Sequence, residues 1–180
     1  MFKCAFILNS RSLSPETYSA EYKNEEFHFY MAAVHGLKMT CELAEQLGDE
    51  DFNCLDLCGF YDEKMEARVQ EAAGANLKVS HAKYTKEQQE KFNQLESQKE
   101  FGLIIMAKGT ENKPQRIEME SLEINTHIAL VNSEEMAVKV AREMIQHGID
   151  FIELCSYFDA EKAEAFIEGI GRQVPVGYCG

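Results

Sequence analysis

Short apolar runs alternate with amphipathic stretches along the chain. In the first half, an apolar run at Phe29–Val34 precedes a stretch with one apolar helical face, and further runs follow at Phe52–Cys58 and Leu77–His81. The apolar helical face consists of Met39, Leu43, Ala44 and Leu47. Short strands that alternate with helices of about ten residues predict right-handed crossovers and a mostly parallel sheet.

The same pattern recurs 97 residues further along the chain. Residues 27–82 align with residues 124–179 without a gap, and ten positions are identical, where random pairing would match about three. A fixed period predicts a repeated structural unit. The expected fold class is therefore α/β, with two tandem repeats that each form a small, mostly parallel sheet with crossover helices. Because two copies in one chain can stand in for a homodimer, we expect a pseudo-twofold between the repeats.

The pattern places the first α/β repeat at residues 1–83, a linking helix at 84–100 and the second repeat at 101–180. Each repeat begins with an apolar strand, Phe2–Leu8 or Phe101–Lys108, and a polar stretch follows at residues 9–26 or 109–122. The linking helix is rich in Lys, Glu and Gln, and its expected role is to join the copies. Its less polar face consists of Tyr84, Gln88, Phe92 and Leu95.

Polar residues mark where the helices should begin. Asp62 and Asp159 are expected to cap the second helix of each repeat, because a carboxylate can accept the free N–H groups of the first turn. Asn132 and Glu135 have the spacing of a capping box for the helix after residue 131. The expected ends of the second helices are Gly74 and Gly171.

The charge of the chain narrows the class of partner. The formal net charge is -13 and no basic patch is visible, so neither nucleic acid nor an anionic membrane surface is expected as a partner. No apolar run approaches the length of a membrane helix. The first residues read as a strand and not as a signal peptide. With six cysteines, none in a C-x-x-C pair or with zinc-site spacing, a reducing cytoplasm is the expected location and no metal site is expected.

The segment that is most similar between the copies is Leu55–Asp62, which aligns with Ile152–Asp159. Both segments run from the end of a strand into a helix, and open parallel sheets bind ligands beyond the carboxyl ends of their strands. The free N–H groups of a helix start favour an anion there. We therefore expect a small anionic molecule, such as a carboxylate or phosphate, as a partner.

Four residues in these segments are candidates for catalysis. Cys58 and Cys155 are either nucleophilic thiolates or small residues that pack at the strand end. An acid two residues earlier would raise the pKa of the thiol, which favours packing. These acids, Asp56 and Glu153, lie inside apolar strands, and each is either a general base or a carboxylate held by structural hydrogen bonds or on an edge strand.

Further candidates to contact a ligand flank the same strand ends. The aromatic pairs of the two turns could form the wall of a pocket or pack in the core. His35 aligns with Asn132 before the first helix of each copy, and His81 aligns with Tyr178 at the last strand. The candidate ligand-binding residues are His35, Gly59, Phe60, Tyr61, His81, Asn132, Ser156, Tyr157 and Tyr178. Because Gly59 aligns with Ser156, the two turns have diverged.

The run from Gly148 to Cys155, an aromatic turn, a helix and then Val174–Gly177 resembles the family known as domain of unknown function 6506. The opening strand Phe2–Ile7 is similar to that family as well. The resemblance implies single-copy members with a glycine-rich turn after the cysteine, and this chain looks like two such units. It departs from the pattern where Phe60-Tyr61 and Ser156-Tyr157 replace glycines. The resemblance implies no activity.

Two hypotheses for the function follow. In the first, the chain is a cytoplasmic α/β protein that binds a small ligand at the strand ends near Asp56, Cys58, Glu153 and Cys155, with the carboxylates open to a role in acid–base catalysis. In the second, it is a non-enzymatic module whose aromatic turns bind a protein or build a homo-oligomer. No cofactor is indicated by any motif. A deep pocket around the acids would favour the first, and a flat exposed apolar patch the second.

Overall fold

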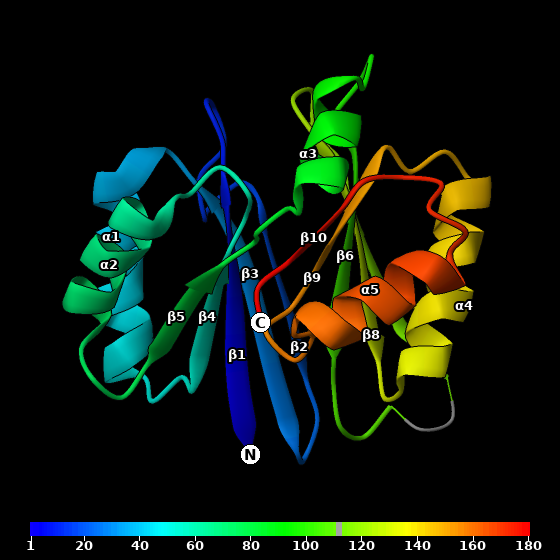
Figure 1. Ribbon diagram of the computed structural model, residues 1–180. Helices are drawn as coiled ribbons and strands as arrows, with labels where there is room; N and C mark the ends of the chain where they lie inside the picture. The colour runs from blue at the N-terminus through cyan, green and yellow to red at the C-terminus, as the bar shows by residue number, and fades with distance from the viewer. Residues whose placement is uncertain (111–112) are drawn as a thin grey trace. The chain divides into compact units, whose positions relative to one another are not determined.

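A computed structural model describes residues 1–110 and 113–180 of the chain (Figure 1). Residues 111 and 112, within the polar stretch expected at 109–122, lie outside the described residues. The chain divides into two units, Met1–His81 and Ala82–Gly180. Apolar positions repeat with the period of a strand or helix in each unit, so each buries its own apolar side chains between a sheet and helices.

The first unit is a five-stranded mixed sheet with the strand order β2-β3-β1-β4-β5. All neighbouring strands are parallel except β2 and β3, which are antiparallel. The strands are β1 (Phe2–Asn9), β2 (Ser19–Lys23), β3 (Phe27–Val34), β4 (Cys54–Leu57) and β5 (Lys78–His81). Two helices follow β3 and β4, namely α1 (Gly36–Asp49) and α2 (Glu63–Ala73).

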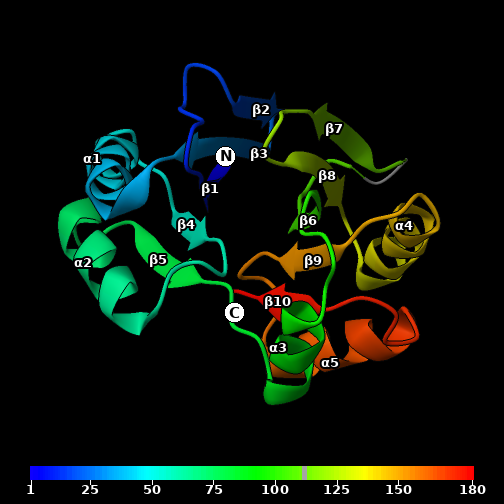
Figure 2. The same cartoon turned by 90° about the horizontal axis from the view of Figure 1, so that it is seen from above.

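The second unit repeats this arrangement with the strand order β10-β9-β6-β8-β7. Its strands are β6 (Glu100–Met106), β7 (Gln115–Met119), β8 (Asn125–Val131), β9 (Phe151–Leu154) and β10 (Val176–Tyr178). Its helices are α3 (Lys86–Asn93), α4 (Glu134–Gln146) and α5 (Ala160–Gly169). Seen from above, α1 and α2 lie together beside the first sheet, and α4 and α5 lie together beside the second (Figure 2).

Strand pairing has the same register in both units. Cys4 pairs with Cys54 in the first sheet, and Phe101 pairs with Phe151 in the second, so both partners are shifted by 97 positions (4 to 101, 54 to 151). The antiparallel edge pairs correspond in the same way, with Ser19 opposite Ala32 and Arg116 opposite Ala129. The predicted α/β fold in two tandem, mostly parallel repeats is confirmed. The predicted pseudo-twofold stays a prediction.

Strands β2 and β7 were not predicted, because they lie in the stretches that read as polar. Their residues alternate between exposed and half-buried, as suits an edge strand with one face toward solvent. Each forms an antiparallel hairpin with the strand that follows it. Exposed and half-buried residues alternate in both segments, but the residues are so polar that the sequence resembles that of a loop.

The helix caps agree with the prediction at four helix ends and differ at one. Asp62 and Asp159 cap α2 and α5. Gly74 and Gly171 have φ values of +77° and +69° at the ends of the same helices. The cap of α4, however, is Ser133, whose hydroxyl accepts the backbone N–H of Met136 at 3.2 Å. The expected cap at Asn132 is wrong by one residue, because a serine and an asparagine stand side by side and either can cap a helix.

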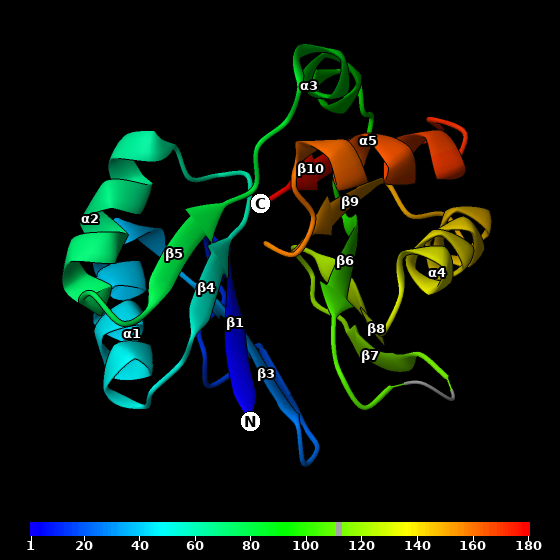
Figure 3. The same ribbon diagram turned by 60° about the horizontal axis from the view of Figure 1, so that its bottom comes forward.

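The crossovers explain why both helices of a unit share one face. The chain moves from β3 past β1 to β4 and then on to β5, always in the same direction across the sheet. Right-handed crossovers made in one direction place their helices on one side. Figure 3 shows β4 and β5 side by side with α2 next to them. The central strand β1 is buried on both faces from Cys4 to Leu8.

A close contact between α1 and α2 yields the first prediction. A Cβ atom added to Gly48 would lie 2.4 Å from the carbonyl oxygen of Ala73, so Gly48→Ala should force the two helices apart. We expect a loss of about 1–3 kcal/mol in the free energy of unfolding, measured by urea denaturation, although alanine ordinarily stabilises a helix relative to glycine. Gln46→Ala, at an exposed position of the same helix, should change little. A Gly48→Ala protein more stable than wild type would contradict this packing.

Candidate functional site

Adjacent strands β1 and β4 end where the chain departs in opposite directions. From β1 it goes toward β3, and from β4 it goes toward β5. Strands β6 and β9 have the same relation in the second unit. Such a topological switch point is where open parallel sheets bind ligands, because the diverging connections leave a crevice at the strand ends. Asp56 and Cys58 lie at the end of β4, and Glu153 and Cys155 lie at the end of β9.

A thiol occupies each switch point. The Sγ atom of Cys58 accepts the backbone N–H of Asn9 at 3.3 Å, and the Sγ atom of Cys155 accepts that of Met106 at the same distance. Asn9 and Met106 correspond in the repeat. Both cysteines are buried. Each thiol therefore joins the ends of two neighbouring strands, and its use as a nucleophile stays a prediction.

The two candidate acids are buried in the middle of their sheets. Asp56 and Glu153 are each 2% exposed, and their strands, β4 and β9, have neighbours on both sides. The alternative that these acids lie on edge strands is therefore wrong. Burial of a carboxylate is costly unless hydrogen-bond donors accompany it.

Hydroxyl groups from non-equivalent residues supply such donors. The Oγ atom of Ser80 donates to Asp56 at 3.0 Å, whereas the Oη atom of Tyr84 donates to Glu153 at 2.9 Å. Ser80 aligns with Gly177, and a Cβ atom on Gly177 would lie 2.6 Å from the Tyr84 ring. The glycine thus makes room for the tyrosine. The acid is kept in both copies while the residue that donates to it has changed.

The aromatic pairs each contain one buried and one exposed ring. Tyr61 is 3% exposed, and its Oη atom lies 2.6 Å from Oγ1 of Thr40. Burial raises the pKa of Tyr61, so this phenol stays neutral. Phe60, in contrast, is 54% exposed. Of the two predicted ligand contacts, only Phe60 offers its ring to solvent.

The corresponding turn of the second unit is polar. Tyr157 is 44% exposed, its Oη atom donates to Glu134 at 3.1 Å, and the Nζ atom of Lys162 lies 5.0 Å from the centre of its ring. The hydrogen bond to Glu134 raises the pKa of Tyr157. In the first unit, the positions of Tyr157, Glu134 and Lys162 are held by Phe60, Leu37 and Met65. The first turn is therefore apolar where the second is a polar cluster.

Most helix starts near these turns already hold a side-chain acceptor. Asp62 accepts the N–H groups of Lys64 and Met65, both at 2.9 Å. Asp159 accepts the N–H of Lys162 at 2.9 Å and its ammonium group at 2.7 Å, and these bonds lower the pKa of Asp159. An anion at either helix start would have to compete with a carboxylate.

Helix α1 is different from the other helices in residues 1–110 and 113–180. Its flanking residue, His35, makes no side-chain cap, and its first turn contains no acid, whereas α2, α3, α4 and α5 all have side-chain caps. The Nδ1 atom of His35 lies 2.9 Å from the carbonyl oxygen of Ser10 instead. Since a carbonyl only accepts, Nδ1 donates, and this bond holds the exposed ring beside the start of the helix.

The chain in front of α1 is open. Gly36 has a φ of +74°, and a Cβ atom added there would meet nothing within 4 Å. The N–H of Gly36 donates to Oδ1 of Asn9 at 3.0 Å. Asn9 thus connects the end of β1 to the start of α1, and its neighbour across the sheet end is the Cys58 thiol. His35, Gly36 and Cys58 are thereby brought to one end of the first sheet.

The remaining candidates differ in burial and in partners. His81 is buried at the end of β5, where its Nδ1 atom bonds to Glu66 of α2. Tyr178 exchanges two backbone hydrogen bonds with Lys83, at 2.8 and 3.0 Å. Asn132 and Ser156 are half-buried, and Gly59 is exposed next to Phe60. Residues that sequence reasoning missed are Asn9, Glu66 and Ser80; an asparagine at the end of an apolar strand was the one available signal.

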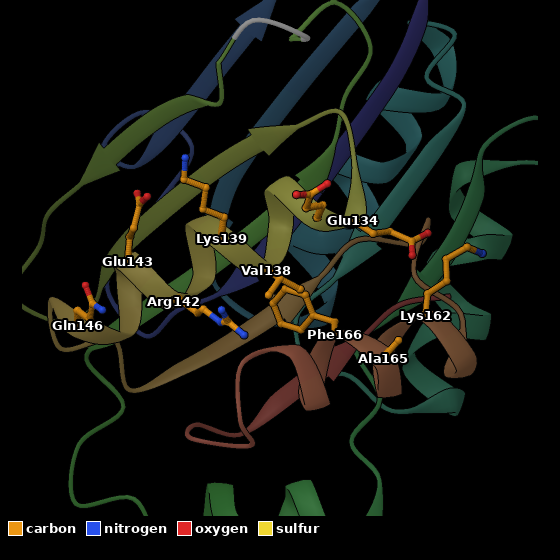
Figure 4. Close-up of a pocket in the computed structure, with 10 residues that line it drawn as sticks. Glu134, Val138, Lys139, Arg142, Glu143, Gln146, Lys162, Ala165 and Phe166 are labelled. Atoms are coloured by element: carbon orange, nitrogen blue, oxygen red, sulfur yellow. The ribbon is translucent and has the colours of Figure 1, made fainter.

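The second unit has a groove that is lined in part by Glu134 and Lys162, the partners of Tyr157. It has a volume of about 610 Å³ and runs between α4 and α5 (Figure 4). Val138 and Phe166 lie at its middle, and Lys162 and Glu134 lie at one end. The Nε and Nη2 atoms of Arg142 donate to the carbonyl oxygen of Gly169 at 2.9 and 2.6 Å, so this arginine ties the two helices. A smaller groove of about 340 Å³ lies between α1 and α2.

Metal and membrane sites were also sought in the described residues. Within 1–110 and 113–180, no three His, Cys, Asp or Glu side chains are grouped closely enough to hold a metal ion. In the same part of the chain, no helix has both the length and the apolar character needed to cross a bilayer.

Comparison with known families agrees with the repeat. The model of a family of unknown function, DUF6506, matches residues 2–97 and again residues 99–180. The chain belongs to this family. No curated protein and no solved structure matches it significantly. The first DUF6506 copy includes α3 (Lys86–Asn93), although this helix packs in the second unit.

In this DUF6506 chain, α3 packs against the second sheet. The Oε1 atom of Gln88 accepts the backbone N–H of Val176 at 3.0 Å, and the Phe92 ring packs against Phe151 with 5.1 Å between centroids. Together with the Tyr84 hydroxyl on Glu153, these contacts make the linking segment part of the second sheet's covering.

The hydroxyl of Tyr84 yields the second prediction. Tyr84→Phe removes a donor from the buried Glu153 and should lower the free energy of unfolding by about 1–3 kcal/mol, measured by thermal and urea denaturation. Tyr178→Phe is the matched control, because that half-buried tyrosine is held through its backbone. Equal stability of Tyr84→Phe and wild type would mean that the hydroxyl does not support Glu153.

Cys41 yields a prediction on pH. This half-buried thiol lies 3.8 Å from the carbonyl oxygen of Arg68, and desolvation by burial raises its pKa. Since the thiolate is the reactive form, alkylation by iodoacetamide should reach half its maximal rate at a higher pH than free cysteine does. Mass spectrometry should find Cys41 modified before the five buried cysteines, and Cys41→Ser should remove the early product. Alkylation at the pH typical of a free thiol would contradict the raised pKa.

Proposed function

We propose that the protein binds a small anionic molecule at the carboxyl end of its first sheet, between the start of α1 and the turn after β4. The observation that carries the proposal is the start of α1: its N-cap residue His35 makes no side-chain cap, its first turn has no acid, and open space lies at Gly36, whose N–H bonds to Asn9. Its position beside a topological switch point supports the same location. Backbone N–H groups and the helix dipole would hold a carboxylate or phosphate there.

The surroundings fit a ligand with an apolar part. Phe60 exposes 54% of its surface at the turn that follows Cys58 and Gly59. Leu37 and Met65 take the positions at which the second unit has Glu134 and Lys162. Ligand pockets combine apolar walls with a few polar groups that fix orientation, so the anionic group would lie at α1 and the apolar part along Phe60.

The second unit supports this reading by contrast. At the corresponding place Ser133 caps α4, Glu134 adds a negative charge in the first turn, and Tyr157 bonds to that charge. An anion there would be repelled by the Glu134 carboxylate, and the N–H of Met136 already donates to Ser133. We therefore assign one binding site to each chain, in the first unit, and a structural role to the second copy of the turn.

The proposal has two further parts. A role for Asp56 and Glu153 in acid–base chemistry is supported by the retention of the acid in both copies with different donors. A cytoplasmic location is supported by six cysteines that are all free thiols. The alternative of a protein-binding module is favoured by one observation, the exposed Phe60 ring, and the experiment below separates it from ligand binding.

The proposal predicts a thermal shift that one charge abolishes. In a screen of small carboxylates and phosphates, a ligand at 100 times its Kd should stabilise wild type by about 2.7 kcal/mol and raise its melting temperature. Leu37→Glu copies Glu134 into the first turn of α1, where an acid stabilises a helix by about 0.3–1 kcal/mol but repels the anion. This variant should melt no lower than wild type and show no shift with ligand.

Further variants serve as controls and test the buried acids. Glu134→Leu in the second unit should leave the wild-type shift intact, and so should Asp62→Asn, since asparagine caps a helix as well as aspartate does. Asp56→Asn and Glu153→Gln test whether the buried acids take part. A full ligand shift in Leu37→Glu would refute the site at α1. No shift with any anion, together with capture of a protein through Phe60, would favour the interaction module.

A further inference from the structure

A histidine and a glutamate pair at the same end of the first sheet. His81 is the last residue of β5, and its neighbour across the sheet is Leu57, which directly precedes Cys58. Glu66 lies in the first turn of α2 and bonds to the Nδ1 atom of His81. The proposed anion site does not use either residue. The exposed fractions of the two side chains are 8% and 27%, so the pair lies just beneath the surface.

The bond to Glu66 determines which nitrogen is left for chemistry. A carboxylate that accepts from Nδ1 fixes the ring orientation and the tautomer, and the other nitrogen, Nε2, is then available to exchange a proton. In the described residues the buried nitrogens without a partner include Nδ1 of His28 but not Nε2 of His81. With 8% of its surface exposed, the His81 side chain is not completely enclosed.

His28 provides the comparison within the same unit. It also bonds to a carboxylate, with Nε2 2.6 Å from Glu21, and its side chain has a similar exposed fraction of 11%. Its second nitrogen, however, is buried and packed near the Phe52 ring. Such a histidine can hold two elements together but cannot pass a proton to a bound molecule. The two pairs share their chemistry. They differ in the second ring nitrogen, which in His28 is buried without a hydrogen-bond partner.

The second copy has lost both members of the pair. His81 aligns with Tyr178, and Glu66 aligns with Ala163. Ala163 is buried, and α5 packs with the apolar side chains of Phe166 and Ile167. A polar tie between helix and strand is therefore not required by the fold, because the same crossover forms without one.

We propose that His81 is a proton-transfer residue and that Glu66 is the residue that positions it. In this role Nε2 of His81 takes a proton from a molecule bound at the carboxyl end of the sheet and returns it to the product or to water. The identity of that molecule rests on the proposed function, but the reactivity of the pair does not. The first unit would then both bind and transform its ligand.

Hydrolysis of 4-nitrophenyl acetate tests the pair directly. Water adds to the acetyl carbonyl as Nε2 takes one of its protons, and 4-nitrophenolate leaves as the acetyl group becomes acetic acid. The acetic acid ionises to acetate, and the proton on Nε2 passes to solvent. Since general-base catalysis contributes about 10²–10⁴-fold, we expect wild type to be at least about tenfold faster than His81→Gln. Glu66→Gln keeps the imidazole and should fall between the two, with a changed pH–rate profile that a purely structural tie would not produce.

The matched control is His28→Gln, which removes the other histidine of a His–Glu pair and should keep the wild-type rate. Circular dichroism and melting curves establish that each variant is folded. A wild-type rate equal to that of His81→Gln, or an equal loss in His28→Gln, overturns the proposal. Because the ester carries no charge, this outcome is independent of the anion screen. If His81 is active but no anion raises the melting temperature, the proton-transfer role stands and the site at α1 is refuted. If an anion raises the melting temperature but His81→Gln is as fast as wild type, the site at α1 stands and the proton-transfer role is refuted.

Discussion

The topology of each unit depends on its central strand, which is β1 in the first unit and β6 in the second. In the first unit β1 pairs in parallel with β3 on one side and with β4 on the other, and its middle residues are buried on both faces. A parallel strand in that place needs apolar side chains on both faces, which is why its sequence is a continuous apolar run. It also forces the chain to leave β1 and β4 in opposite directions. The meeting of Asn9, Gly36 and Cys58 at the strand ends is a consequence of that topology.

Much of this could be predicted from the sequence. The 97-residue period located both copies, and apolar runs located the parallel strands, because such strands are buried on both faces. Strands β2 and β7 could not be predicted, since an edge strand with a solvated face has a composition close to that of a loop. The cap of α4 was misplaced because Asn132 and Ser133 are adjacent and chemically equivalent for the purpose.

The site was less accessible to prediction than the fold. Proximity along the chain pointed to Asp56, Cys58 and their counterparts, and these do lie at the strand ends. The hydroxyl donors Ser80 and Tyr84 come from 24 and 69 residues away from the acids they serve, and no local pattern announces such a contact. That His35 does not cap α1 could not be predicted either, because its ring bonds to the distant carbonyl oxygen of Ser10.

The two copies show how a duplicated unit diverges without a change of fold. Register and crossovers are the same, whereas the groups at the strand ends are not. An apolar turn in the first copy corresponds to a polar turn in the second, and the His–Glu pair of the first copy aligns with Tyr178 and Ala163. Backbone pairing constrains the core positions in both copies. The residues beyond the strand ends are not part of this pairing and differ between the two copies.

Helix α3 belongs to the first copy of the family by sequence and to the second unit by packing. The first DUF6506 match extends through residue 97, yet Tyr84, Gln88 and Phe92 pack in the unit that begins at Ala82. Cutting the gene at the family boundary would deprive the second sheet of the side chains that cover Glu153 and Phe151. Recombination that exchanges whole family copies would therefore also exchange part of the neighbour's core, which ties the evolution of each copy to that of the other.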